Sequence, residues 1–173
     1  MILPRLCLSP KLRVHVAFVL TVVFCCGLTA CQRSDLVCHD PLGCIEIGKN
    51  DSVSLAALLA LSGDAAYLGE EALGGIEIAI AQQGGGLLDH PLELVTADSV
   101  CQANSAQAEV ESLTAVSPPI VGIVGPVCTA VAEAVMPLVS QSGLVMVSPA
   151  NTAVSLTTAP ADGGLWQPGY YRT

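Results

Sequence analysis

Val121-Gly-Ile-Val-Gly-Pro-Val-Cys-Thr129 is the stretch of sequence that decides the fold. The apolar run from Ile120 to Val124 predicts a fully buried strand of a parallel sheet. Gly125-Pro126 ends this strand, and a helical pattern begins near Cys128 or Thr129. A strand that leads through a glycine turn directly into a helix presents free backbone N–H groups and the positive end of the helix dipole. The stretch therefore predicts an anion-binding turn, to which Thr129 adds a hydroxyl.

The segments around this stretch alternate between strand and helix patterns. We predict strands over 53–61, 92–96, 120–124 and 144–147, the start of another at 169–173, and helices over 67–82, from 104 or 105, and over 129–142. The Ala and Leu content of 53–61 also permits a helix, but the turn residues Ser62-Gly-Asp64 favour a strand. Pro137 predicts a kink or break in the third helix. The order predicts an α/β fold with a parallel, doubly wound sheet, right-handed crossovers and helices on both faces.

The first thirty residues have the pattern of a secretory signal peptide. Basic residues precede an apolar run from Val14 to Leu28, which is shorter than the roughly 20 residues of a membrane span. Leu28-Thr-Ala-Cys31 resembles a bacterial lipobox, which implies cleavage before Cys31 and a lipid on its sulfur. Ordinary cleavage with a free Cys31 thiol is the alternative. We therefore expect a signal peptide over 1–30, a lipid-anchored tether over 31–50, a ligand-binding lobe over 51–173, and a location in the periplasm or at the cell surface.

Charge and cysteine content narrow the possible functions. Without residues 1–30, three basic and fifteen acidic side chains remain, a formal net charge of −12, which excludes binding of nucleic acid through a basic patch. Five cysteines also remain. If Cys31 carries the lipid, the other four can form two disulfides in an oxidising compartment. Cys38 and Cys44 are near enough to close a small loop, although two unpaired thiols are the alternative.

Catalytic motifs are missing from the sequence. The chain has no G-x-S-x-G elbow, no phosphate-loop motif, and neither H-E-x-x-H nor C-x-x-C spacing for a metal. His39 and His90 are the only histidines after residue 30, one in the tether and one before a proline in a turn. We therefore predict a protein that is not an enzyme and needs no cofactor or metal.

Three polar turns follow predicted strands and so share one edge of the sheet: 62–67, 125–129 and 148–152. They supply hydroxyls, backbone donors and one aromatic ring, a set of groups for holding a small polar molecule. The alternative is that their Ser and Thr residues only cap helices and turns.

The chain after Asn50 resembles the Leu/Ile/Val-binding type of periplasmic receptor, the branched-chain amino-acid-binding proteins of ABC importers. The order and spacing of six stretches carry this resemblance: Leu61–Gly69, Gly74–Ala79, His90–Val95 with Asp98, Gly122–Thr129, Val145–Thr152 and Tyr171–Thr173. It implies an amino acid or amide as ligand, membrane permease subunits as partners, and capture for transport as the function.

The resemblance also implies roles for individual residues. Cys128 and Thr129 correspond to the loop that gives a hydroxyl and a backbone N–H to the ligand carboxylate. The turn of Ala150, Asn151 and Thr152 corresponds to the one that gives a carbonyl to the ligand ammonium and further donors to the ligand. Tyr67 corresponds to an aromatic of the pocket, and Cys101 and Cys128 correspond to a disulfide pair.

The sequence departs from this family at its end. Members have two lobes with the ligand between them, and Thr173 falls where they continue toward the second lobe. We therefore expect an amino-terminal portion that binds amino acids weakly and exposes apolar surface. Two alternatives stay open: a ligand-sensing receptor module of the same fold, and a truncated envelope lipoprotein that binds nothing.

Overall fold

A computed structural model describes residues 37–116 and 119–173 of the chain. The predicted signal peptide and Cys31, the predicted site of lipid attachment, lie outside these residues. Residues Cys38–Thr173 form one compact unit, which includes the part of the predicted tether that follows Cys38. Within the described residues, no helix has the length and apolar character that crossing a membrane requires.

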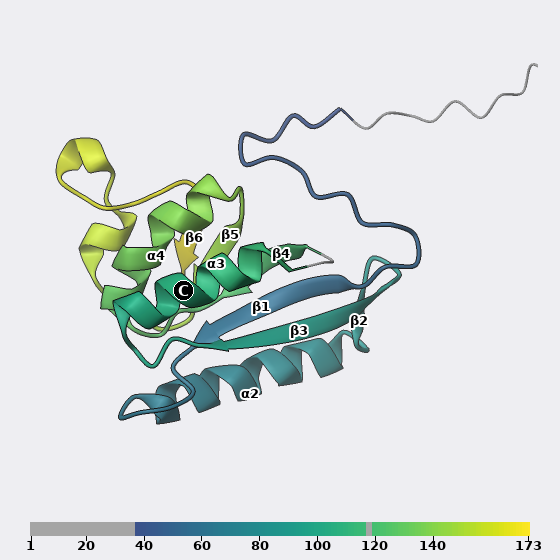
Figure 1. The fold of residues 1–173 in the computed structure, drawn as a ribbon, viewed down its shortest axis with the longest axis horizontal. Helices are drawn as coiled ribbons and strands as arrows, with labels where there is room; N and C mark the ends of the chain where they lie inside the picture. The colour runs from purple at the N-terminus through teal and green to yellow at the C-terminus, as the bar shows by residue number, and fades with distance from the viewer. Residues whose placement is uncertain (1–36, 117–118) are drawn as a thin grey trace, which may run out of the picture. The chain divides into compact units, whose positions relative to one another are not determined.

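A six-stranded sheet organises this unit, in the spatial order β2-β3-β1-β4-β5-β6 (Figure 1). All pairs are parallel except β2 with β3, which are antiparallel. From β1 the chain moves outward to β3 and then returns past β1 to β4, so the winding direction reverses between β1 and β4. The strands are β1 (Val53–Leu59), β2 (Gly86–Leu87), β3 (His90–Asp98), β4 (Ile120–Val124), β5 (Val145–Ser148) and β6 (Tyr170–Arg172).

Helices cover both faces of the sheet, as predicted. Figure 1 shows α2 on one face and both α3 and α4 on the other. The elements are α2 (Ala66–Gln82), α3 (Ala103–Thr114), α4 (Thr129–Gln141), and two short 3₁₀ helices, η1 (Val154–Thr157) and η2 (Pro160–Asp162). The predicted fold class, a parallel doubly wound α/β sheet, is confirmed.

The central strand β1 divides the interior into two cores. Its side chains alternate between the two faces because successive residues of a strand point in opposite directions. Ala56 and Leu58 pack with the residues of α3 and α4, whereas Ala57 and Leu59 pack with those of α2. All four are fully buried. This burial on both faces explains why the sequence of β1 is a continuous apolar run.

Several local predictions were wrong. Neither Asn104 nor Ser105 caps α3; its N-cap is Gln102, with no side-chain cap hydrogen bond. Of the kink or break expected at Pro137, the break does not occur, because α4 runs from Thr129 to Gln141. Pro137 removes the bond to the carbonyl of Glu133, but Glu133 is exposed and water can reach that region. The small strand β2 was not predicted because two residues carry no periodicity.

Gly69 and Gly74 of α2 give a matched test of how closely this helix approaches β1. A Cβ on Gly69 would overlap the carbonyl oxygen of Ala60, whereas one on Gly74 would meet no atom within 4 Å. We expect Gly69→Ala to lower the free energy of unfolding by about 1–3 kcal/mol or more through overpacking. Gly74→Ala should raise it by about 0.5–1 kcal/mol, because alanine is the better helix former. Urea unfolding of the two variants measures both, and destabilisation by Gly74→Ala would contradict this packing.

Candidate functional site

The three polar turns lie on one edge of the sheet, at the carboxyl ends of its central strands. Ala57, Val124 and Val147 form one row across β1, β4 and β5, so the turns that follow these strands are neighbours. The first two turns flank the point where the winding direction reverses. Ligands of open α/β sheets bind at this point, outside the carboxyl ends of the strands.

Ser148 joins two of these turns. Its hydroxyl donates a hydrogen bond to the carbonyl of Pro126 at 2.7 Å. The same oxygen accepts from the backbone N–H of Asn151 at 3.0 Å and of Ala150 at 3.3 Å. Ser148 is completely buried, so these bonds form away from water. A single hydroxyl thus fixes the turn after β5 against the turn that leads into α4.

The amino terminus of α4 opens onto the same edge. Thr129 is the first helical residue, and Cys128 precedes it in an extended conformation without a side-chain cap hydrogen bond. Both residues are half-buried. The backbone N–H groups of the first turn therefore have no side-chain acceptor from the cap residue, and the helix dipole makes the position favourable for an anion.

The turn of Ala150, Asn151 and Thr152 is held from behind by β6. Arg172 donates from Nη1 to the carbonyl of Asn151 at 3.2 Å and of Ala153 at 3.0 Å. The buried Asn151 side chain donates from Nδ2 to the hydroxyl of Tyr170 at 3.1 Å. The Asn151 side chain is therefore tied to β6 through its Nδ2, while Ala150 and Thr152 are exposed.

Asp98, at the end of β3, holds the turn after β1. Its Oδ1 accepts from the backbone N–H of Leu61 at 2.8 Å and of Val100 at 2.9 Å. Burial alone would raise the pKa of Asp98, but hydrogen bonds from the Ser62 hydroxyl and from the backbone N–H groups of Val100, Leu61 and Ser62 outweigh it. The net result is a pKa below the ordinary value of 3.8.

Both expected disulfides are formed. Cys101 bonds to Cys128 across 27 residues and ties the turn after β3 to the start of α4. Cys38 bonds to Cys44 at the opposite edge of the sheet. Closing a loop of 27 residues stabilises the fold by about 3–4 kcal/mol in the chain-entropy model. The larger disulfide therefore restrains the turn that leads into α4.

Tyr67 stands at the beginning of α2, just after the turn that follows β1, and 62% of its side chain is exposed. The positioning roles of Ser148, Asp98 and Arg172 were not predicted from the sequence. Each follows or ends a strand, but the partners of all three lie in other turns. Their signals in the sequence were these positions and their place in the stretches that carry the family resemblance.

The groups gathered at this edge are backbone donors, carbonyls and hydroxyls, which can hydrogen-bond a small polar solute. His90 lies at the opposite, amino-terminal end of the strands, where its Nδ1 forms a hydrogen bond with the carbonyl of Asp51 at 2.8 Å. In residues 37–116 and 119–173, no group of three or more His, Cys, Asp or Glu side chains is arranged to hold a metal ion.

Comparison with known proteins identifies relatives of this lobe. The sequence profile of the periplasmic binding protein family matches residues 52–172. A search among curated proteins gives no significant match.

Several solved structures share the fold. An ABC transporter substrate-binding protein from Sphaerobacter thermophilus is 26% identical, with a TM-score of 0.65. A solute-binding protein of an ABC transporter from R. palustris, in complex with benzoate, is also 26% identical, with a TM-score of 0.62. The alignments cover 70% of this chain and 32% of each relative. The branched-chain amino acid transporter substrate-binding protein LivJ from Streptococcus pneumoniae, in complex with isoleucine, has a TM-score of 0.61 at 19% identity, over 70% of this chain and 33% of LivJ. The chain thus spans about a third of the length of these relatives.

Removing the Ser148 hydroxyl tests whether it joins the two turns. We expect Ser148→Ala to lower the free energy of unfolding by about 1–3 kcal/mol, because buried N–H and C=O groups lose their partner. Ser142→Ala is the matched control, since that hydroxyl also bonds a backbone carbonyl but is exposed. Its effect should stay within about 0.5 kcal/mol. Equal effects in urea unfolding would argue against the role of Ser148.

The lowered pKa of Asp98 predicts a pH dependence of stability. A carboxylate whose folded pKa lies below its unfolded pKa stabilises the fold fully above the unfolded value, and this contribution is lost as the pH falls through the folded value. We expect wild type to exceed Asp98→Asn in free energy of unfolding at about pH 7, and the difference to shrink below about pH 4. Urea unfolding across this range measures it. A difference that is constant with pH would contradict the ionised, hydrogen-bonded carboxylate.

Proposed function

Because the chain belongs to the periplasmic binding protein family, we propose that it is the amino-terminal lobe of a solute-binding protein that serves an ABC importer. One observation carries the proposal: the start of α4, without a side-chain cap hydrogen bond, opens at the point of the sheet where ligands bind in this fold class. The neighbouring turns add hydroxyl and backbone groups. Membrane permease subunits are the expected partners, and the captured solute is handed to them.

We propose a carboxylate-bearing solute as the ligand, with branched-chain or related amino acids as the leading candidates. The helix dipole and the N–H groups of α4 suit a carboxylate, and the hydroxyl of Thr129 can donate to it. Two of the structural relatives were solved with carboxylates, benzoate in one and isoleucine in the other. These two molecules share the carboxylate and differ elsewhere, which supports a carboxylate as the group that this lobe would recognise.

The location follows from the same proposal. We place the protein outside the cytoplasm, in the periplasm or at the cell surface, with a lipid on Cys31. Two disulfides within the described residues fit an oxidising compartment.

Paired ligands test the carboxylate site. We expect isoleucine or benzoate to bind more tightly than isoleucinamide or benzamide, measured by isothermal titration. Thr129→Val removes one hydroxyl bond to a charged group and should weaken carboxylate binding by roughly tenfold or more. Thr114→Val is the matched control, because Thr114 ends α3 and its hydroxyl bonds only the carbonyl of Glu111.

Two results would contradict the proposal. One is equal affinity for acids and amides, which would remove the anion from the recognition. The other is an unchanged affinity of Thr129→Val for a carboxylate, which would move the ligand away from the start of α4.

A further inference from the structure

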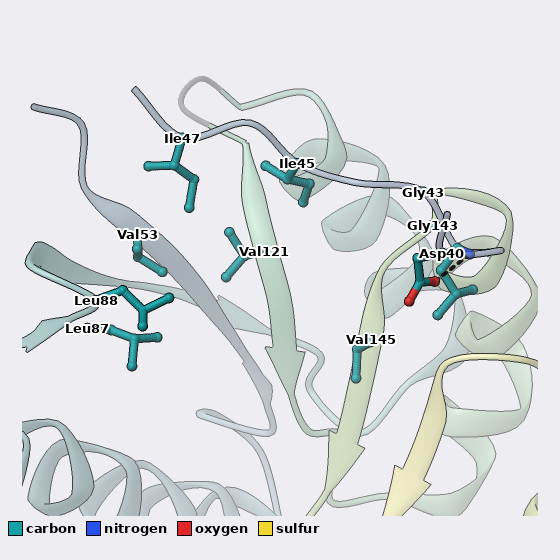
Figure 2. A pocket seen from close by; sticks show the side chains of 11 residues that line it. Asp40, Gly43, Ile45, Ile47, Val53, Leu87, Leu88, Val121, Gly143 and Val145 are labelled. Carbon is teal, nitrogen blue, oxygen red and sulfur yellow. Dashed lines mark hydrogen bonds between the residues drawn. The ribbon is translucent and has the colours of Figure 1, made fainter. Parts of the chain in front are cut away.

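The amino-terminal edge of the sheet carries exposed apolar side chains, at the opposite end of the strands from the candidate site. Leu88 is 82% exposed, Leu87 40% and Ile45 38%. We call these three residues the base patch. The base patch borders a hollow of about 340 Å³ (Figure 2). The other apolar residues that line this hollow are Leu42, Ile47, Val53, Val121 and Val145.

Leu88 lies in a turn whose backbone conformation is unusual for a leucine. Leu88 and Asp89 form the turn between β2 and β3, with φ values of 53° and 65°. This left-handed region is disfavoured for a residue with a Cβ, and turns of this kind usually contain Gly or Asn. A leucine held there with 82% exposure packs little against the described residues. Most of its side chain is therefore free to contact something outside them.

Residues 38–48, which we call the strap, determine where the chain reaches the amino-terminal ends of the strands. Residues 38–48 cross the amino-terminal ends of the strands (Figure 2), and the Cys38–Cys44 disulfide closes the first part of the strap into a loop. Leu42 approaches Gly143 and Gly169 so closely that a Cβ on Gly143 would overlap the Leu42 carbonyl oxygen. The position of Cys38 is thus set by the lobe.

The length of chain before Cys38 limits how far the edge can lie from a membrane. Cys38 lies seven positions after Cys31 in the sequence, and a fully extended chain of that length spans at most about 25 Å. If Cys31 bears a lipid, as the proposed function states, the base patch stays near the bilayer surface. The candidate site, at the carboxyl ends of the strands, then faces away from the bilayer. We propose that the base patch rests on the headgroup region of the bilayer in which this lipid is inserted.

The charges around the patch select the kind of lipid. Among the described residues in the strap or beside the patch, four are acidic and one is basic: Asp40, Glu46, Asp51 and Asp89 against Lys49. This negative surrounding is repelled by anionic headgroups. A zwitterionic bilayer surface therefore fits the base patch. Three apolar side chains alone bind such a surface weakly, so the contact depends on the lipid on Cys31, which keeps the patch near the bilayer.

Tryptophan fluorescence tests the contact on the full chain. Leu88→Trp places a reporter in the base patch, and Val154→Trp places one at a residue that is 73% exposed in η1, after the turn that follows β5. Each protein is reconstituted in phosphatidylcholine vesicles with brominated acyl chains, and wild type supplies the background of Trp166. We expect Leu88→Trp to emit at shorter wavelength and to lose roughly half of its added emission, as for a side chain 5–10 Å into the interface. Val154→Trp should keep its emission, and phosphatidylglycerol should reduce the quenching of Leu88→Trp.

The other outcomes overturn the proposal in distinguishable ways. Vesicle-bound protein without quenching of Leu88→Trp refutes the patch and leaves the lipoprotein proposal intact. Protein that stays off the vesicles, with no lipid on Cys31 by mass spectrometry, overturns both. A blue shift of Leu88→Trp that grows with protein concentration in the absence of vesicles shows that a second copy covers the patch instead.

Discussion

The pairing of β1 with β3 on one side and β4 on the other is the constraint on which the structure depends. Because β1 is buried on both faces, its register to its neighbours fixes where every helix packs and where every strand ends. A shift by one residue would exchange the two cores, since Ala56 and Leu58 face one layer and Ala57 and Leu59 the other. The candidate site is a consequence of this register.

The two edges of the sheet have different chemistry for a physical reason. At the carboxyl edge, chain ends lead into helices, so unpaired N–H groups and dipoles gather there and buried polar residues hold them in place. Ser148, Asp98 and Arg172 each bridge separate turns at this edge. At the amino edge, the strap and the turn between β2 and β3 present apolar side chains. The proposed tether at the amino edge would leave the carboxyl edge free to meet a solute.

Patterns within single segments made most of the fold predictable. The apolar runs and the turn residues located β1, β4 and β5 to within one or two residues, and the periodicity located α2 and α4. Where a prediction was wrong, tertiary context decided. Asn104 and Ser105 are good cap residues, yet α3 starts directly after Gln102. The turn before this helix is held by Asp98, Ser99 and the Cys101–Cys128 disulfide, and it decides where the helix starts. Pro137 is tolerated because the carbonyl it leaves free belongs to an exposed residue.

The sequence by itself determined the class of the fold, the turn from β4 into α4, and the set of turns that share an edge, because strand direction and side-chain periodicity are local properties. Only the tertiary structure decided how those turns are joined. The Ser148 hydroxyl reaches Pro126 across 22 residues, and the Asp98 carboxylate reaches Leu61 across 37. No local pattern encodes such partners, since they become neighbours only after the strands have paired. The same holds for the base patch, whose members come from the strap and from the end of β2.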